Sequence, residues 1–328
     1  MRITFCDHRI LFLVFSALNH NGYDLEGNPE MHPLRIYVRE QLAGLPENDY
    51  FRQAAAGWPR ANWLGATALC LGDDLQFTHD PTPLWDEIDW ESPEPLDGAA
   101  RAWLGELPEH LTSWEQQPRV AALWPEYLGR IREAETPGLR QEIVKLVEQR
   151  LSLLPQPVEH ALTVLPNYLQ SDWSADPVRV STRHYIILGP LSLRLADSIL
   201  HELLHEYFGP LLEPLRPTLG RAIRLLEPDH ALLARWGYWH VSDANKTVYK
   251  VLQECCVRAA MALLLASSID TADWGNYGLN LAYPLYAHFR RQGYFSSAAE
   301  VEEYLLSELS AAAATSAKPA SQGRTRSG

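Results

Sequence analysis

The chain has few cysteines, 4 among 328 residues, and their spacing excludes the disulfide framework of small secreted domains. Cys255 and Cys256 are neighbours, Cys6 and Cys70 stand alone, and no pair has the C-x-x-C spacing of a zinc ribbon or redox motif. A chain of this length buries about three quarters of its unfolded surface, so its core needs no covalent staple. We therefore expect free thiols and a cytoplasmic location.

Positive charge is also scarce. Lys and Arg number 28 against 41 Asp and Glu, which gives a formal net charge of −13 at pH 7. Such a surface repels a phosphate backbone, so we expect no nucleic-acid partner. Long apolar runs are missing as well: none reaches the roughly 18 residues of a transmembrane helix, and we expect no membrane span.

A secretory leader is not indicated either. The apolar run Ile10–Leu18 follows Asp7 and His8, and the polar segment Asn19–Asn21 stands where a small-residue cleavage site would be needed. The favoured interpretation is an amphipathic helix of the mature chain. An atypical signal peptide is the alternative.

Helical periodicity dominates the N-terminal half. The composition, 46% hydrophobic and 21% charged, is that of a globular protein. Proline-rich joints such as Asp80–Pro83 separate the periodic segments. The predicted helices are Arg9–Leu18, Leu34–Leu42, Asn62–Leu71, Ala99–Leu111, Arg119–Glu133 and Gly138–Leu153. We therefore expect an all-helical N-terminal region over residues 1–157.

Strand-forming residues concentrate beyond that boundary. Ala161–Leu165 and Val178–Leu188 are rich in β-branched and aromatic residues and flank a turn-like segment, which predicts a small sheet or a hairpin. Further helices are predicted over Leu211–Leu226, Lys246–Ala266, Asn280–Gln292 and Ala298–Leu309. The expected fold class is α+β and mostly helical, with a second domain over 158–310 and a disordered tail over 311–328.

The motif that carries chemistry is H-E-L-L-H at residues 201–205, on the helix predicted after the second strand. His201 and His205 differ by about 40° around a helix, so both reach one metal ion. Glu202 lies about 60° from His205, where a base can take a proton from water at the metal. The opposite side of this helix is apolar, which predicts a core face and a chemical face. The residues of that side are Ile199, Leu200, Leu203 and Leu204. A surface helix that carries two histidines by chance is the alternative.

A third ligand is needed, because two side chains do not complete a zinc site. The strongest candidate is Glu254, on a helix that is apolar on every side and is therefore expected to be buried. A buried carboxylate is costly unless it is paired or binds a metal. One interpretation is an internal ion pair between Glu254 and Arg258. The favoured one makes Glu254 the third ligand and Arg258 the residue that orients it. Possible substitutes for Glu254 are Asp229, His230, His240 and Asp243.

Several residues are candidates for supporting roles. Asp197, one turn before His201, is placed to accept a hydrogen bond from an imidazole, although the helix dipole alone explains an acid there. Cys255 and Cys256 follow Glu254 and are predicted to be small core residues. An oxyanion-stabilising side chain is expected from a later segment. The candidates for it are Tyr238, His240, Tyr277 and Tyr283.

On these residues the sequence resembles the gluzincin type of zinc metallopeptidase, in which HExxH on one helix is joined by a Glu from a later helix. More narrowly, it resembles a family of uncharacterised bacterial HExxH proteins, mainly over residues 160–310. The segments that carry this resemblance are H-E-L-L-H-E-Y-F-G-P-L at 201–211, E-x-x-V-R-A at 254–259, G-Y-F at 293–295 and, more weakly, residues 9–23. The resemblance implies a zincin-like fold and one Zn²⁺ held by His201, His205 and Glu254.

The resemblance also implies hydrolysis of a peptide or protein substrate, with Glu202 as the general base. The strand Val178–Leu188 is then either the sheet edge that pairs with an extended substrate or an ordinary core strand. The alternative function is a non-catalytic metal-binding protein, or a helical interaction protein, that retains HExxH.

Overall fold

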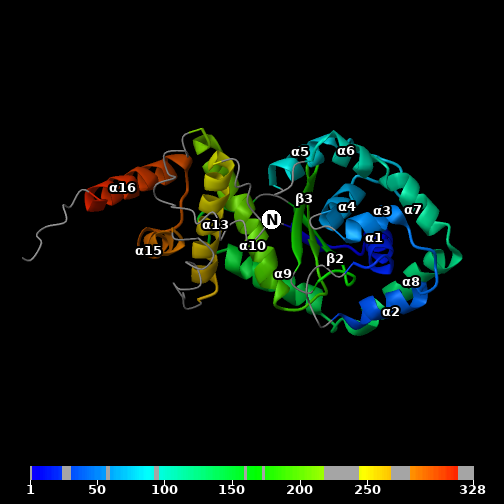
Figure 1. The fold of residues 1–328 in the computed structure, drawn as a ribbon. Helices are drawn as coiled ribbons and strands as arrows, with labels where there is room; N and C mark the ends of the chain where they lie inside the picture. Colours follow the sequence, from blue (N-terminus) through cyan, green and yellow to red (C-terminus); the bar gives the residue numbers. More distant parts are fainter. Residues whose placement is uncertain are drawn as a thin grey trace, which may run out of the picture. The chain divides into compact units, whose positions relative to one another are not determined.

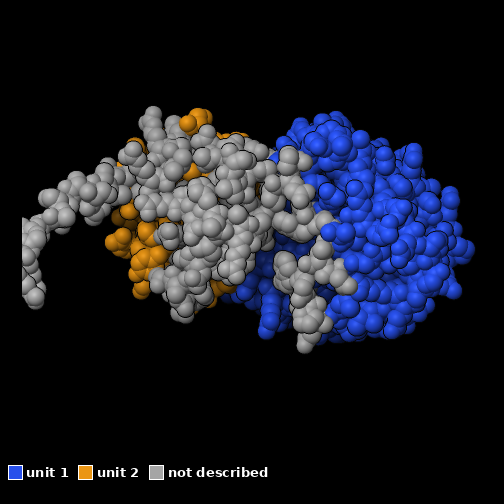
Figure 2. Space-filling view, viewed as in Figure 1, with its two compact units in different colours: residues 1–153, 157–202 blue, residues 154–156, 203–328 orange. Residues whose placement is uncertain are grey.

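The computed structural model of the chain is α+β and mostly helical, which confirms the predicted fold class. It describes residues 2–23, 31–56, 60–91, 96–158, 161–171, 174–217, 244–266 and 281–316. The chain divides into two compact units, residues 1–153 with 157–202 and residues 154–156 with 203–328 (Figure 2).

Along the chain, the segment that connects the first two strands of the first unit is helical (Figure 1). They are α1 (Arg9–His20), α2 (Pro33–Leu42), α3 (Asp49–Ala55), α4 (Arg60–Ala68), α5 (Thr82–Glu91), α6 (Gly98–Gly105), α7 (Leu107–Glu115), α8 (Pro118–Ala134) and α9 (Leu139–Leu151). The segment Ala99–Leu111, predicted as one helix, is split between α6 and α7. Pro108 stands in the first turn of α7, where its missing N–H is tolerated. In the interior of one continuous helix the same proline would remove a backbone hydrogen bond and break the helix. Helices α3 and α5 were not predicted.

The sheet has four strands among the described residues, in the order β1-β2-β4-β3. They are β1 (Arg2–Phe5), β2 (Ala161–Pro166), β3 (Ala175–Val180) and β4 (Arg183–Leu188). β1, β2 and β4 run parallel, and β3 pairs antiparallel with β4. Because β1 belongs to this sheet, the expectation of an all-helical N-terminal region is wrong. The compact units divide the chain between residues 202 and 203, inside the helix that carries the motif, and residues 154–156 group with the second unit.

The hairpin lies elsewhere than the sequence indicates. The predicted strand Val178–Leu188 is interrupted at Ser181, whose φ of 56° turns the chain from β3 into β4. β2 and β4 are instead parallel neighbours, and β4 lies in the interior of the sheet. Of the two interpretations of Val178–Leu188, the core strand holds for β4, whereas residues 178–180 belong to β3. Among the described strands, β1 and β3 form the two edges.

Helix α1 lies inside the hydrophobic core of the first unit rather than at the surface of that unit. Its side chains are buried continuously over residues 10–19, so the prediction of a helix is confirmed, and its polar residues Ser16 and Asn19 are buried with the apolar ones. Gly65 of α4 lets α1 approach closely, because a Cβ at that position would lie 3.1 Å from the Phe15 ring. In β4, Ile186 and Ile187 point to opposite faces and are both buried, so both faces of the sheet are covered.

The second unit is helical throughout its described part. It contains the C-terminal half of α10 (Leu195–Leu212), the short 3₁₀ helix η1 (Glu213–Leu215), α13 (Ala244–Leu264), α15 (Ala282–Gln292) and α16 (Ala298–Ser316). Aromatic side chains fill its core: the Phe208 ring stacks on Phe289 at 5.8 Å, and the Tyr207 hydroxyl donates a hydrogen bond to the Phe295 carbonyl at 2.8 Å.

Two predicted boundaries in this unit are wrong. α10 continues through Pro210 to Leu212, so no separate helix begins at Leu211, and residues 218–226 of that prediction lie outside the described residues. α16 runs on to Ser316, past the expected start of a disordered tail at 311, because the alanine-rich segment there favours helix. Residues 317–328 lie outside the described residues.

Two expectations about the whole chain can be compared with the structure. No described helix has both the length and the apolarity required to cross a membrane. The four cysteines are free thiols, as predicted, with Cys6 exposed and the other three buried.

Candidate metal centre

Helix α10 has the two faces that its sequence predicts. Its apolar side is buried, with exposed fractions of 2% or less for Ile199, Leu200, Leu203 and Leu204. His201, Glu202 and His205 are only partly buried. The histidines are therefore held on a rigid helix whose opposite side is anchored in apolar packing, while their rings remain accessible.

The first turn of α10 is tied to α9. Asp197 accepts a hydrogen bond from Arg150, and the two form an ion pair. The sequence suggested that Asp197 orients an imidazole. The structure instead gives it a guanidinium partner, in addition to its favourable position at the positive end of the helix dipole.

Helix α13 supplies Glu254 from a buried setting. Val251 and Val257, on the same side of this helix, are fully buried, and the Glu254 side chain is 14% exposed. Cys255 and Cys256 are buried as predicted, and burial raises the pKa of both thiols. Both are therefore core residues.

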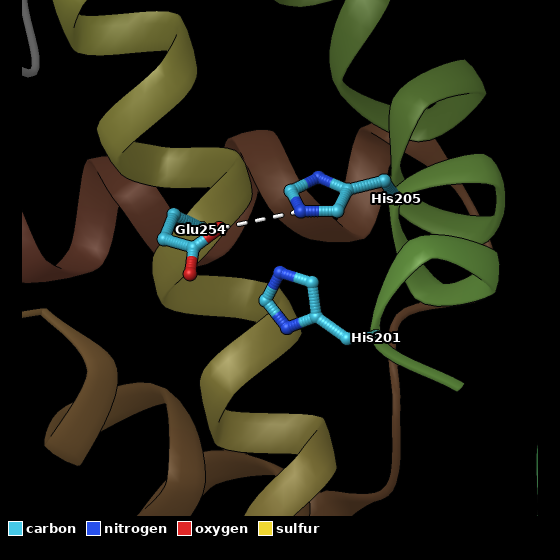
Figure 3. Close-up of side chains that lie close together, drawn as sticks. All are labelled: His201, His205 and Glu254. Atoms are coloured by element: carbon cyan, nitrogen blue, oxygen red, sulfur yellow. Dashed lines mark ion pairs between the residues drawn. The ribbon is translucent and has the colours of Figure 1, made fainter. Parts of the chain in front are cut away.

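The three predicted ligands converge. One ligand atom from each of His201, His205 and Glu254 lies within 4.8 Å of the others. Figure 3 shows both imidazoles extending from α10 toward the Glu254 carboxylate on α13. Nε2 of His205 lies 3.2 Å from Oε2 of Glu254.

This donor set fits a zinc ion. Two ligand atoms that each lie about 2.1 Å from a tetrahedral zinc are about 3.4 Å apart, close to the separation between His205 and Glu254. Two imidazole nitrogens and one carboxylate oxygen are also the ligands of several catalytic zinc sites, which keep their remaining positions for water and substrate. The same trio occurs at non-haem iron sites, so the donors alone do not select zinc.

Glu254 has a second partner. Nε of Arg258 donates a hydrogen bond of 2.5 Å to Oε1 of Glu254, while Oε2 faces His205. The two interpretations offered by the sequence, an ion pair and a metal ligand, are therefore compatible. The arginine side chain is 50% exposed, so the pair is not sealed in the core.

One residue of the centre was not predicted. Gln253 precedes Glu254 and is 9% exposed, and its Nε2 donates a 3.4 Å hydrogen bond to the backbone carbonyl of His205. Consecutive residues of α13 therefore contact the same residue of α10, one through its backbone and the other through its ring. The sequence feature that could have identified Gln253 is its amide side chain next to the candidate ligand, on a helix that is otherwise apolar.

Several alternative candidates are not described. Asp229, His230, His240 and Asp243, the possible substitutes for Glu254, lie outside the described residues, as do Tyr238 and Tyr277. Of the candidates for oxyanion stabilisation, only Tyr283 is described. It lies on α15 and is 53% exposed.

Comparison with protein-family models, with curated proteins and with solved structures gives no match. The geometry of the centre therefore has to support any functional conclusion.

Proposed function

We propose that the protein is a zinc-dependent hydrolase of peptide bonds. In this proposal His201, His205 and Glu254 hold one Zn²⁺, and Glu202 is the general base. The observation that supports it is the convergence of two imidazoles from one helix and a carboxylate from another within 4.8 Å. The H-E-x-x-H spacing, joined by Glu254 from a later helix, is the gluzincin arrangement that the sequence resembles.

Each residue of the motif has a separate task. When bound, Zn²⁺ polarises a carbonyl group and lowers the pKa of water to about 7. Glu202, on the turn of α10 between the two ligands, accepts a proton from the attacking water and returns it to the leaving amine. The buried side of α10 keeps its ligands in place during this exchange, since rigid elements hold reacting groups more accurately than loops.

The experiment combines metal analysis with hydrolysis of a library of internally quenched fluorescent peptides. We expect the wild-type protein to retain stoichiometric zinc and His201→Ala to lose it. Glu202→Gln should keep the metal but hydrolyse about 10²- to 10⁴-fold more slowly, the usual contribution of a general base. Glu148→Gln, the same change on the exposed side of α9, is the matched control.

Two outcomes would contradict the proposal. If the purified wild-type protein contains no zinc, the proposed metal centre is contradicted. Wild-type protein that holds zinc through His201 yet cleaves no peptide would favour the alternative, a non-catalytic metal-binding protein.

A further inference from the structure

The two oxygens of Glu254 have different partners. Oε1 accepts the 2.5 Å hydrogen bond from Nε of Arg258, and Oε2 lies 3.2 Å from Nε2 of His205. The carboxylate thus lies between a guanidinium on its own helix and an imidazole on α10. A freely rotating glutamate would have no fixed assignment of its oxygens.

The setting of Arg258 allows it to hold this orientation. It follows Glu254 by four residues, so both side chains leave the same face of α13. The glutamate is 14% exposed and the arginine 50%, which puts the carboxylate inside and the guanidinium toward the solvent. Hydrogen bonds between a charged donor and a charged acceptor are roughly twice as strong as neutral ones. Oε1 is therefore engaged before any cation arrives.

This division determines how the carboxylate can bind a metal. A carboxylate with both oxygens available can bind a zinc ion through both, which uses up a coordination position. Because Oε1 already accepts a charge-assisted hydrogen bond from Arg258, a second metal bond through Oε1 is disfavoured, and the protein then supplies two nitrogens and one oxygen. Catalytic zinc sites have three protein ligands and leave the fourth position for water or substrate.

We propose that Arg258 is a positioning residue that makes Glu254 a monodentate ligand and so keeps a coordination position open. This inference rests on the proposed metal centre, but not on the identity of the substrate. It assigns to Arg258 control over coordination number, beyond the general role of holding a helix surface together.

The test is metal binding by Arg258→Gln and Arg258→Lys, read without any activity assay. Zinc affinity is measured by competition with a chromophoric chelator, and coordination by the visible spectrum of the Co²⁺-substituted protein, which weakens as the coordination number rises. Removing a residue that orients a ligand typically lowers metal affinity about 10- to 100-fold, and we expect this for Arg258→Gln together with a weaker Co²⁺ spectrum. Arg258→Lys keeps the charge but not the fixed donor geometry, so it should lie between wild type and Arg258→Gln.

Arg130→Gln is the matched control. Arg130 forms an ion pair with Glu126 at the same four-residue spacing on α8 and lies over the Tyr37 ring at 3.7 Å, so its loss reports the general effect of removing a paired arginine away from the centre. Thermal unfolding of each variant checks the fold. If Arg258→Gln does not fold, the result for Arg258→Lys tests the inference. The inference would be overturned if both variants, or the lysine variant alone, had the zinc affinity and the Co²⁺ spectrum of the wild-type protein. The metal centre would stand in that case. Absence of zinc from the wild-type protein would instead overturn the proposed function.

Discussion

At the scale of single residues, histidine has a second use in this protein as a helix cap. Nδ1 of His8 accepts a hydrogen bond from the backbone N–H of Leu11 at the start of α1, and Nδ1 of His32 accepts one from Leu34 at the start of α2. A ring nitrogen accepts only when it is unprotonated. Burial lowers the pKa of both histidines, which favours the neutral form that each cap requires.

The cap at His8 makes stability depend on pH. Burial is the main cause of its lowered pKa, the neighbouring Arg9 lowers it further, and Asp73 opposes this. In the unfolded chain the ring binds a proton near pH 6.5, whereas the folded protein resists protonation. Stability is therefore full above that value and falls as the pH drops through the lower folded pKa.

We expect His8→Asn to remove part of this loss, because asparagine caps a helix without titrating. The measurement is urea unfolding at pH values on either side of about 6.5. His79→Asn supplies the comparison, since it removes an exposed histidine that caps no helix. An unchanged slope of stability against pH in His8→Asn would show that the cap does not titrate.

Residue identity predicted which side chains converge better than it predicted the residues that support them. The H-E-L-L-H spacing predicts two ligands from local helix geometry alone, and a carboxylate on an apolar helix identified Glu254. Asp197 shows the limit of this reasoning. Its distance from His201 along the helix is compatible with a bond to the ring, but its partner is Arg150, a residue of another helix. Side-chain partners across elements depend on packing that no local pattern encodes.

At the scale of helices, the centre depends on how α13 is placed along α10. Gln253 donates its hydrogen bond to the carbonyl of His205, and Gly209, one turn later on α10, lies close to the same amide. A shift of either helix along its axis would break this contact and move Glu254 away from His205. Gln253 therefore contributes to the accuracy of the centre without being a ligand.

Replacing Gln253 with Leu tests this role. We expect a loss of about 1 kcal/mol in unfolding free energy, the usual net value of a buried hydrogen bond. Zinc affinity should also fall, about 10-fold, because the ligand from α13 is no longer held in register. Zinc titration and urea unfolding of the same preparations measure the two effects.

Gln170→Leu separates the two effects. Gln170 is 2% exposed and donates hydrogen bonds to Ser174 and Asp176, so its loss should cost at least as much stability. Its partners lie at the start of β3, outside α10 and α13, so this change should leave zinc affinity unchanged. If both variants lose stability but neither loses affinity, Gln253 has only a structural role.

Elements were predicted well where their periodicity is long and poorly where they are short. The helices corresponding to α1, α2, α8, α9, α13 and α15 are confirmed to within a few residues. β1 has only four residues, and its hydrogen-bond partner β2 is far away in the sequence. No local sequence pattern therefore predicts this strand. The turn at Ser181 was missed for a related reason: a positive φ in serine is imposed by the pairing of β3 with β4.

At the scale of the whole molecule, metal binding should appear as stability. A ligand that binds the folded chain and not the unfolded one stabilises it by about 2.7 kcal/mol at 100 times its Kd. For a folded unit of roughly 150 to 250 residues this corresponds to a rise in Tm of about 5 to 10 °C. We expect such a rise with Zn²⁺ in differential scanning calorimetry.

His201→Ala and Mg²⁺ are the controls for this effect. The variant lacks one of the three donors, and Mg²⁺ prefers oxygen ligands in octahedral geometry, so neither combination should shift the transition. The two compact units can unfold in separate transitions, and the shift should be read for each. An equal rise in His201→Ala would mean that zinc stabilises the chain from another site.

The local part of this protein was determined by its sequence alone. The histidine spacing, the apolar side of α10 and the apolar surroundings of Glu254 follow from the period of a helix, which depends only on neighbouring residues. Tertiary structure was needed to bring Glu254 to His205, to divide the carboxylate between His205 and Arg258, and to join β1 to β2. These contacts link segments distant in sequence, and their geometry arises from the packing of whole elements.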